Sequence, residues 1–257
     1  MGLHDSTLGY ARFMILLGMA LALFNLGHQA AAEEPSAADP AWQEAIEAAI
    51  HKYILAHPEV IVESLRAMEA RRQEAEHTDR QKMIVVRQGD LLQDPMSPAS
   101  GNPIGDVTVV EFFDYRCGFC KRVAGAVTQL QKDDGNVRVV YKDFPILGEL
   151  SILAAKAALA ARKQGKHQVF HEALLDSGNE LTKEGLFAIA TRVGLDADKL
   201  KEDMQSPDLQ AILDRNRLLG NELGITGTPA FIIGADLRSG ALQLNELKDL
   251  VTRARTQ

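Results

Sequence analysis

The sequence VVEFFDYRCGFCKRV, residues 109–123, joins an apolar, strand-like run to the only two cysteines of this 257-residue chain. Cys117 and Cys120 are separated by two residues, Gly118 and Phe119. A pair with this spacing serves as a structural disulfide, as half of a zinc site or as a redox centre. The rest of the sequence distinguishes between these three uses.

The composition is that of an ordinary globular protein, with 46% hydrophobic and 25% charged residues. The formal net charge is −7 at pH 7. Nucleic-acid-binding domains normally carry a basic excess, so the charge argues against a nucleic-acid partner.

Residues 1–32 have the pattern of a secretory signal peptide. Their apolar core, residues 13–26, is 14 residues long. As a helix it spans about 21 Å, which is short of the roughly 30 Å of hydrocarbon in a bilayer. Ala30 and Ala32 supply the small residues of a cleavage site. We therefore expect cleavage after Ala32 and export from the cytosol, with an uncleaved anchor as the alternative.

Export bears on the use of the cysteines. Disulfides persist outside the cytosol, but a bridge across two intervening residues closes too short a loop to stabilise a fold much. A structural zinc site needs four ligands, and the only suggestive partners are His167 and His171, the first of them 47 positions after Cys120. Such an i, i+4 histidine pair is typical of a solvent-facing helix side. We therefore predict no metal site.

A redox centre fits the pattern better. A helix that begins at Cys117 directs Cys120 inward, on an apolar stripe with Val123, Ala124, Val127 and Leu130. Cys117 then lies exposed at the helix N-terminus, where unpaired N–H groups and the dipole favour a thiolate. Three cations, Arg116, Lys121 and Arg122, surround this position. An exposed nucleophile with a shielded partner suits thiol–disulfide exchange.

The order of elements predicts an α/β core with a helical insertion. Strands are expected over 107–115 and 136–144, joined in parallel by the helix 117–133. Residues 147–224 read as helical, two strands flank the turn at 234–236, and a helix closes the chain over 244–255. The prolines and glycines of 95–106 indicate a linker.

Two further helices are expected before this core. One begins at Pro40, and the other runs from Pro58 to 94 after a break at His57. The second has an imperfect coiled-coil seam of Ile61, Leu65, Met68 and Ala75, interrupted by Arg72. Domains are therefore predicted over 33–98, an oligomerisation segment, and 99–257.

The motifs EFFDYRCGFC (111–120), KDFP (142–145) and GTPAF (227–231), with the helical insertion, resemble the exported DsbA-like branch of the thioredoxin-fold family. The resemblance covers Val107 to the C-terminus. The segment LAHPEVIVESL (55–65) is similar to the suppressor-of-copper-sensitivity C (ScsC-like) proteins, some of which oligomerise through this region. The implied fold is a thioredoxin fold with a helical insertion of about 147–224, preceded by a helical segment that forms a dimer or trimer.

The resemblance also assigns roles. Cys117 is the attacking thiol, Cys120 the resolving thiol, and Glu111 a buried acid that exchanges a proton with Cys120. Pro229 is a cis-proline that packs against the pair, and the Thr228 backbone binds an extended substrate segment. The Gly118–Phe119 dipeptide departs from the Pro-His of the strong oxidant, so no redox potential is implied.

The predicted function is that of a periplasmic protein-disulfide oxidoreductase or isomerase without a cofactor. Its expected partners are exported proteins with thiols or disulfides and a DsbD- or DsbB-like membrane redox protein. The alternative is a copper(I)-handling protein that uses the same two thiolates, because soft ligands suit cuprous copper. Such a protein would need neither Glu111 nor the Thr228–Pro229 element.

Overall fold

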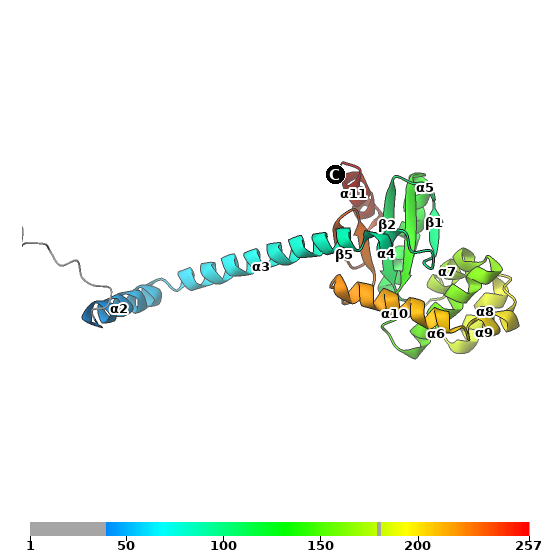
Figure 1. Ribbon diagram of the computed structural model, residues 1–257, viewed down its shortest axis with the longest axis horizontal. Coiled ribbons are helices and arrows are strands. Elements are labelled where there is room, and N and C mark those ends of the chain that lie inside the picture. Colours follow the sequence, from blue (N-terminus) through cyan, green and yellow to red (C-terminus); the bar gives the residue numbers. More distant parts are fainter. Residues whose placement is uncertain (1–39, 179–180, 257) are drawn as a thin grey trace, which may run out of the picture. The chain divides into compact units, whose positions relative to one another are not determined.

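The computed structural model describes residues 40–178 and 181–256 (Figure 1). The signal peptide predicted for residues 1–32 lies outside these described residues. The chain divides into two compact units, with the boundary between Ala70 and Arg71. None of the helices described in residues 40–178 and 181–256 combines the length and apolar character needed to cross a membrane.

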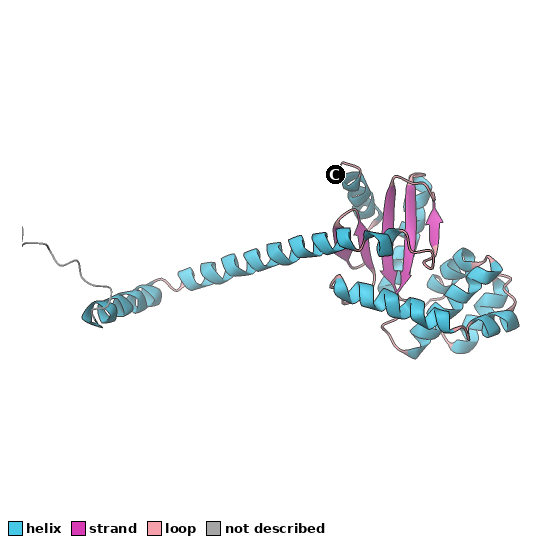
Figure 2. Cartoon of the chain, viewed as in Figure 1, coloured by secondary structure: helices cyan, strands magenta, loops and turns pink. Residues whose placement is uncertain are grey.

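The second unit contains a five-stranded sheet with the order β1-β3-β2-β4-β5 (Figure 2). Its strands are β1 (Ala99–Gly101), β2 (Val107–Phe113), β3 (Val137–Asp143), β4 (Ala230–Ile233) and β5 (Asp236–Ser239). Strands β2 and β3 are parallel, as predicted, and the other neighbouring pairs are antiparallel. The expected linker over 95–106 is wrong at β1, a three-residue edge strand. A strand this short carries no alternation that a sequence pattern can reveal.

Helices cover both faces of the sheet (Figure 1). They are α4 (Gln88–Leu92), α5 (Gly118–Asp133), α6 (Glu149–Ala160), η1 (Ala161–Gln164), α7 (His167–Leu175), α8 (Lys183–Arg192), α9 (Ala197–Asp203), α10 (Pro207–Glu222) and α11 (Leu244–Ala254). On one face, Val109 and Phe113 join a core with α5, α11 and the insertion helices α6 to α10. On the other, Val110 and Phe112 pack with α4 and the C-terminal parts of α10 and of the preceding helix α3 (Glu59–Val86). The prediction of a helical insertion over 147–224 is confirmed: its described residues form helices and the turns between them, without a strand.

Helix α5 connects the two parallel strands. It begins directly after Cys117, whose φ of −72° and ψ of 115° are those of an extended N-cap residue. The predicted stripe is buried at Cys120, Val123, Val127 and Leu130. This amphipathic pattern fixes the face that α5 turns to the sheet, and it places the cysteine pair at the end of β2.

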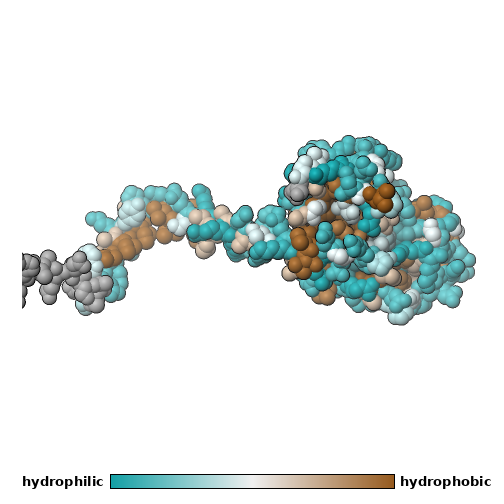
Figure 3. Space-filling view, turned by 45° about the horizontal axis from the view of Figure 1, so that its top comes forward, coloured by the Kyte–Doolittle hydropathy of each residue, from teal (hydrophilic) through white to brown (hydrophobic). Residues whose placement is uncertain are grey.

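The N-terminal helices are α2 (Pro40–Ala56) and α3 (Glu59–Val86), so the break predicted at His57–Pro58 is confirmed. The predicted continuation of α3 to residue 94 is interrupted at Arg87, where α4 follows as a separate short helix. In the first unit, apolar side chains are exposed along these helices (Figure 3). They include Trp42, Ile46, Ile50, Tyr53, Ile61, Leu65 and Met68.

Candidate active site

Cys117 and Cys120 lie together where β2 passes into α5, and both thiols are free. The Cys117 N–H donates to the Asp114 carbonyl at 3.0 Å, which closes the turn between strand and helix. Cys120 is completely buried, whereas Cys117 keeps 7% of its surface exposed. The inward position of Cys120 is therefore confirmed. The expected free exposure of Cys117 is wrong, because another segment of the chain lies against its sulfur.

That segment is Thr228–Pro229, at the start of β4. The peptide bond between the two residues is cis. The Cys117 thiol donates a hydrogen bond to the Thr228 carbonyl at 3.2 Å. Residues 111 positions apart in the sequence thus meet at one sulfur atom. The structure brings together the cysteine pair and the Thr228–Pro229 element.

The two thiols differ in acidity. A hydrogen bond from the Cys120 side chain outweighs the opposing effect of burial and, with smaller contributions from the Thr228 side chain and the backbone N–H groups of Cys120 and Phe119, lowers the pKa of Cys117 to about 5. Burial, and then the hydrogen bond to Cys117, raise the pKa of Cys120 far above its ordinary value. Because the thiolate is the nucleophilic form, Cys117 is the more nucleophilic of the two at neutral pH, whereas Cys120 stays protonated.

The three cations predicted to surround Cys117 have other partners. Arg116 Nη1 donates to the Leu147 carbonyl. Lys121 Nζ donates to the Ser177 hydroxyl and to the Gly178 carbonyl. The Arg122 guanidinium lies over the Phe119 ring, 4.2 Å from its centroid. Hydrogen bonds rather than these charges are therefore the main cause of the acidity of Cys117.

Glu111 lies in the centre of β2, paired in register with Tyr141 of β3 and Phe231 of β4. Its carboxyl is buried, and the atom Oε1 has no hydrogen-bond partner. Burial raises the pKa of Glu111 to about 8. The negative charge of ionised Glu111 is one of the causes that raise the pKa of Cys120. The two groups are therefore electrostatically coupled, and at neutral pH Glu111 holds a proton in most molecules.

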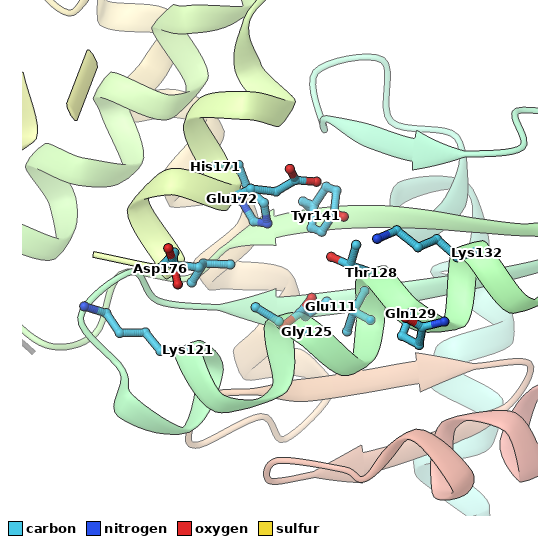
Figure 4. Close-up of a pocket in the computed structure, with 13 residues that line it drawn as sticks. Glu111, Lys121, Gly125, Thr128, Gln129, Lys132, Tyr141, His171, Glu172 and Asp176 are labelled. Atoms are coloured by element: carbon cyan, nitrogen blue, oxygen red, sulfur yellow. The ribbon is translucent and has the colours of Figure 1, made fainter. Parts of the chain in front are cut away.

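A cavity of about 310 Å³ reaches Glu111 between α5 and α7 (Figure 4). Its walls include Lys121, Gly125 and Thr128 of α5 and His171 of α7. A cavity of this size with polar walls holds several water molecules. It gives the carboxyl of Glu111 a route for exchanging its proton with solvent.

Asp114, which sequence reasoning missed, organises the surface beside Cys117. Its carboxylate accepts the N–H groups of Arg116 at 2.7 Å, Ile146 at 2.9 Å and Leu147 at 3.1 Å. The side chains of Ile146 and Leu147 are exposed, as is Phe119 between the two cysteines. A buried carboxylate therefore fixes an apolar dipeptide to the turn that leads to Cys117.

His167 and His171 are buried, so the prediction of a solvent-facing histidine pair is wrong. The side of α7 that carries them packs into the main core with Phe170 and Leu174. The His171 Nδ1 lies 2.9 Å from the Tyr115 hydroxyl. Within residues 40–178 and 181–256, no three His, Cys, Asp or Glu side chains are grouped so that they could hold a metal ion. A buried and an exposed histidine pair can have the same i, i+4 spacing, so only the packing of α7 against the core shows that this pair is buried.

The chain is similar to several known proteins and protein families. Residues 108–252 match the DSBA-like thioredoxin domain, and residues 43–75 match the N-terminal domain of the copper resistance protein ScsC. A thioredoxin-like oxidoreductase from Silicibacter pomeroyi is 46% identical, with a TM-score of 0.65 over 66% of this chain and 98% of its own. The thiol-disulfide exchange protein alpha-DsbA2 from Wolbachia pipientis is 33% identical, with a TM-score of 0.66 over 70% of this chain and 97% of its own.

A curated relative, the Na(+)/H(+) antiporter NhaA 1 from Salinispora arenicola, is 32% identical over 151 residues. The match covers 58% of this chain and 23% of the antiporter, so the chain spans about a quarter of that relative. The DSBA-like match, in contrast, covers more than half of this chain and includes both cysteines, Glu111 and Thr228–Pro229. The chain therefore belongs to the family of DSBA-like thioredoxin domains.

Proposed function

We propose that this protein is a thiol–disulfide oxidoreductase that exchanges disulfides with exported substrate proteins in the periplasm. The observation that carries the proposal is the asymmetry of the pair. Cys117 is acidic and in contact with Thr228, whereas Cys120 is buried and held protonated beside Glu111. Neither a structural disulfide nor a zinc site needs two thiols of opposite acidity.

The first step is attack by the Cys117 thiolate on one sulfur of a substrate disulfide. A bond forms between Cys117 and that sulfur, the substrate disulfide breaks, and the second substrate sulfur leaves as a thiolate. Cys120 then attacks the Cys117 sulfur, which releases the first substrate sulfur and leaves a Cys117–Cys120 disulfide. The substrate gains two electrons and the enzyme loses two. All steps reverse when the protein acts as an oxidant.

Glu111 acts on Cys120. In the forward direction its carboxylate accepts the Cys120 proton, and in reverse its carboxylic acid protonates the departing Cys120 thiolate. A pKa of about 8 keeps Glu111 protonated at pH 7 in most molecules, which favours the reverse direction. The acidity of Cys117 stabilises the reduced pair and favours the same direction. Both features support an oxidase or isomerase rather than a reductase.

The surface around Cys117 supports a protein substrate. Phe119, Ile146 and Leu147 expose apolar side chains on the turns beside the nucleophile. The residues that flank a substrate cysteine lie against this surface whenever the mixed disulfide forms. Apolar flanking residues are buried in folded proteins and accessible in unfolded ones. The site therefore suits incompletely folded exported proteins.

A Cys120→Ser variant tests this function directly. It keeps the Cys117 nucleophile but cannot release a bound substrate, so covalent adducts should accumulate on incubation with a protein that contains scrambled disulfides. The adducts are measured as a reductant-sensitive mass increase on non-reducing gels. The double variant Cys117→Ser/Cys120→Ser is the control and should form none. Equal adduct formation by both variants would contradict the proposal.

We further propose that residues 40–94 oligomerise the protein. The exposed apolar side chains of α2 and the first part of α3 recur at Ile61, Leu65 and Met68, which is the seam spacing of a coiled coil. The match of residues 43–75 to the ScsC N-terminal domain supports the same role. Self-association brings several catalytic sites to one substrate, which favours isomerisation of wrong disulfides.

Removal of residues 33–70, which leaves α4 and the C-terminal part of α3 packed on the sheet, should produce a monomer with altered activity. We expect the truncated protein to oxidise dithiols at the rate of the intact protein, within about twofold, but to lose most of its isomerase activity. Light scattering gives the mass, and refolding of a scrambled-disulfide protein gives the activity. A full-length Leu65→Asp/Met68→Asp variant should behave as the truncation does, because it places charges on the seam. An unchanged mass in both proteins would exclude this role.

The predicted membrane partner belongs to the same proposal. An oxidase needs a membrane protein that removes electrons from its cysteine pair, and an isomerase needs one that supplies them. These are the DsbB-like and DsbD-like roles, respectively. The redox state of the pair in cells, read by thiol labelling, distinguishes them: oxidised cysteines indicate the first partner and reduced cysteines the second.

Copper(I) handling is the second candidate, because the N-terminal helices match a domain named for copper resistance. Two free thiols in one turn of helix are ligands that suit cuprous copper. Titration with copper(I) under reducing conditions separates the two functions when Glu111→Gln is included. Metal binding by the thiols is indifferent to this change, whereas disulfide exchange is not.

A further inference from the structure

The proposed exchange reaction uses neither of the buried histidines of α7, yet His171 makes a hydrogen bond to the turn that leads to Cys117. Its Nδ1 lies 2.9 Å from the hydroxyl of Tyr115. Tyr115 is itself buried and lies two residues before Cys117. A side chain of the helical insertion thus makes a hydrogen bond to the segment between β2 and α5.

The His171 ring also packs on the strands beneath the site. Its centroid lies 4.3 Å from that of Tyr141 on β3 and 5.0 Å from that of Phe113 on β2. Tyr141 is paired in register with Glu111. His171 and Glu111, moreover, line the same cavity, from α7 and from β2 (Figure 4). The His171 ring therefore contacts the turn before Cys117 and strands β2 and β3, and it lines the cavity that reaches Glu111.

We propose that His171 is a positioning residue for thiol–disulfide exchange, which acts through Tyr115 to hold Cys117 in the place where its thiolate is stabilised. The proposal rests on the proposed function, because it concerns the same cysteine. It adds a role for the helical insertion: one of its helices sets the reactivity of the nucleophile.

The physical reason is that this hydrogen bond ties the turn to α7, so that removal of either partner frees the turn to move. Burial, and then the neighbouring His167, hold the pKa of His171 well below its ordinary value, so the imidazole is neutral. Without a partner at Nδ1, the buried Tyr115 hydroxyl would lack a hydrogen bond. Tyr115 would move to find one, and the adjoining turn would move with it.

A shift of this turn would displace Cys117 directly, because Cys117 is bonded to it. The Asp114 carbonyl accepts the Cys117 N–H at 3.0 Å, and the N–H groups of Phe119 and Cys120 stabilise the Cys117 thiolate. A shift of the turn weakens these bonds and raises the pKa of Cys117. The other titratable or charged groups that line the cavity are Glu111 of β2, Lys121 and Lys132 of α5, Tyr141 of β3, and Glu172 and Asp176 of α7. His171→Phe leaves all of them in place.

The experiment measures the rate at which iodoacetamide alkylates Cys117 as a function of pH. It uses the full chain with Cys120→Ser as the background, so that one thiol reports while the serine hydroxyl can still donate a hydrogen bond to Cys117. His171→Phe keeps a planar ring of similar size but removes the nitrogen. We expect alkylation at pH 5 to be about tenfold slower than in the background protein and the rate at pH 9 to be unchanged. His171→Asn, whose amide can replace Nδ1, should restore the background rate at pH 5 to within about threefold.

His167→Phe is the matched control. It removes another buried imidazole from the same helix, one turn away, and the Tyr115 hydroxyl bonds to His171 rather than to this ring. It should leave the alkylation profile unchanged. Tyr115→Phe removes the same bond from the other side and should slow alkylation at pH 5 as His171→Phe does, with no further loss in the double variant. This variant also carries the test if His171→Phe does not fold.

A wild-type alkylation profile in both His171→Phe and Tyr115→Phe would overturn the proposal, as would an equal change in His167→Phe. These outcomes are separate from the failure of the proposed function. Alkylation requires only the Cys117 thiol, and it is measured without a substrate disulfide. Absence of exchange activity in the unmodified protein would contradict the proposed function and leave the alkylation comparison intact.

Discussion

A Cys117→Ser variant is expected to lose exchange activity by on the order of 10³-fold or more, because removal of a nucleophile abolishes the covalent route. A serine hydroxyl is not ionised at neutral pH, whereas the Cys117 thiol, with a pKa of about 5, is almost entirely thiolate. The remaining Cys120 cannot replace it, since that thiol is completely buried and held protonated. Refolding of a scrambled-disulfide protein measures the loss.

The pH dependence of the intact protein is part of the same prediction. Alkylation of Cys117 should reach half of its maximal rate near pH 5 and change little between pH 7 and pH 9. Cys120→Ser is the matched control, because it removes the other sulfur and leaves the attacking one. It should keep rapid alkylation and lose only turnover. Turnover that persists in Cys117→Ser would remove Cys117 from the mechanism.

The core of the fold follows from local pattern. The apolar run of β2, the stripe of α5 from Cys120 to Leu130 and the apolar residues of β3 each have the period of their element. A strand, a helix and a second strand in that order dictate a parallel pair. The break between α2 and α3 was equally predictable, because the residue before a proline avoids helical geometry.

Features that depend on tertiary contacts could not be read in the same way. The exposure of Cys117 is reduced by Thr228, which is 111 positions away. His167 and His171 have the spacing of a surface pair and become buried only when α7 packs into the core. The Asp114 carboxylate accepts hydrogen bonds from the N–H groups of Ile146 and Leu147, and no local sequence pattern predicts those bonds.

The residues of the site were predictable as a set, but not their energetics. Cys117, Cys120, Glu111, Thr228 and Pro229 were named from motifs, and the structure places the cysteine pair against Thr228–Pro229 and couples it to Glu111. Their catalytic roles stay predictions. The opposite acidities arise from the burial of Cys120 and from the hydrogen bond between the two sulfurs, which favours the thiolate at Cys117 and the thiol at Cys120. Both are properties of the folded chain.

Glu111→Gln is expected to stabilise the protein strongly at alkaline pH. The pKa of Glu111 is about 8 in the folded protein, against 4.5 for an ordinary glutamic acid, because burial penalises its charged form. Between these two values the folded state keeps a proton that the unfolded state has released, so the free energy of unfolding falls as the pH rises through this window. At about 1.4 kcal/mol for each tenfold change in the ionisation constant, the full cost is roughly 5 kcal/mol above pH 9.

Glutamine resembles the protonated acid and carries no such cost. The variant should therefore match the wild type near pH 4 and exceed its free energy of unfolding by a few kcal/mol at pH 9. Urea unfolding with both cysteines kept reduced measures this difference. Burial also raises the pKa of Asp143 to about 8, so the free energy of unfolding of Glu111→Gln still falls with rising pH because of Asp143. Only the difference between the two proteins reports Glu111.

The same substitution should slow the Cys120 step by about 10²-fold, because glutamine neither accepts nor supplies a proton. Stability and rate then change in opposite directions, which a residue important only for packing would not produce. Glu172→Gln is the matched control, since Glu172 lines the same cavity at an exposed position. It should alter neither the pH dependence of unfolding nor the exchange rate. A Glu111→Gln protein that unfolds with the wild-type pH dependence would show that the carboxyl of Glu111 is ionised and solvated, and its assignment as the proton carrier for Cys120 would fail with it.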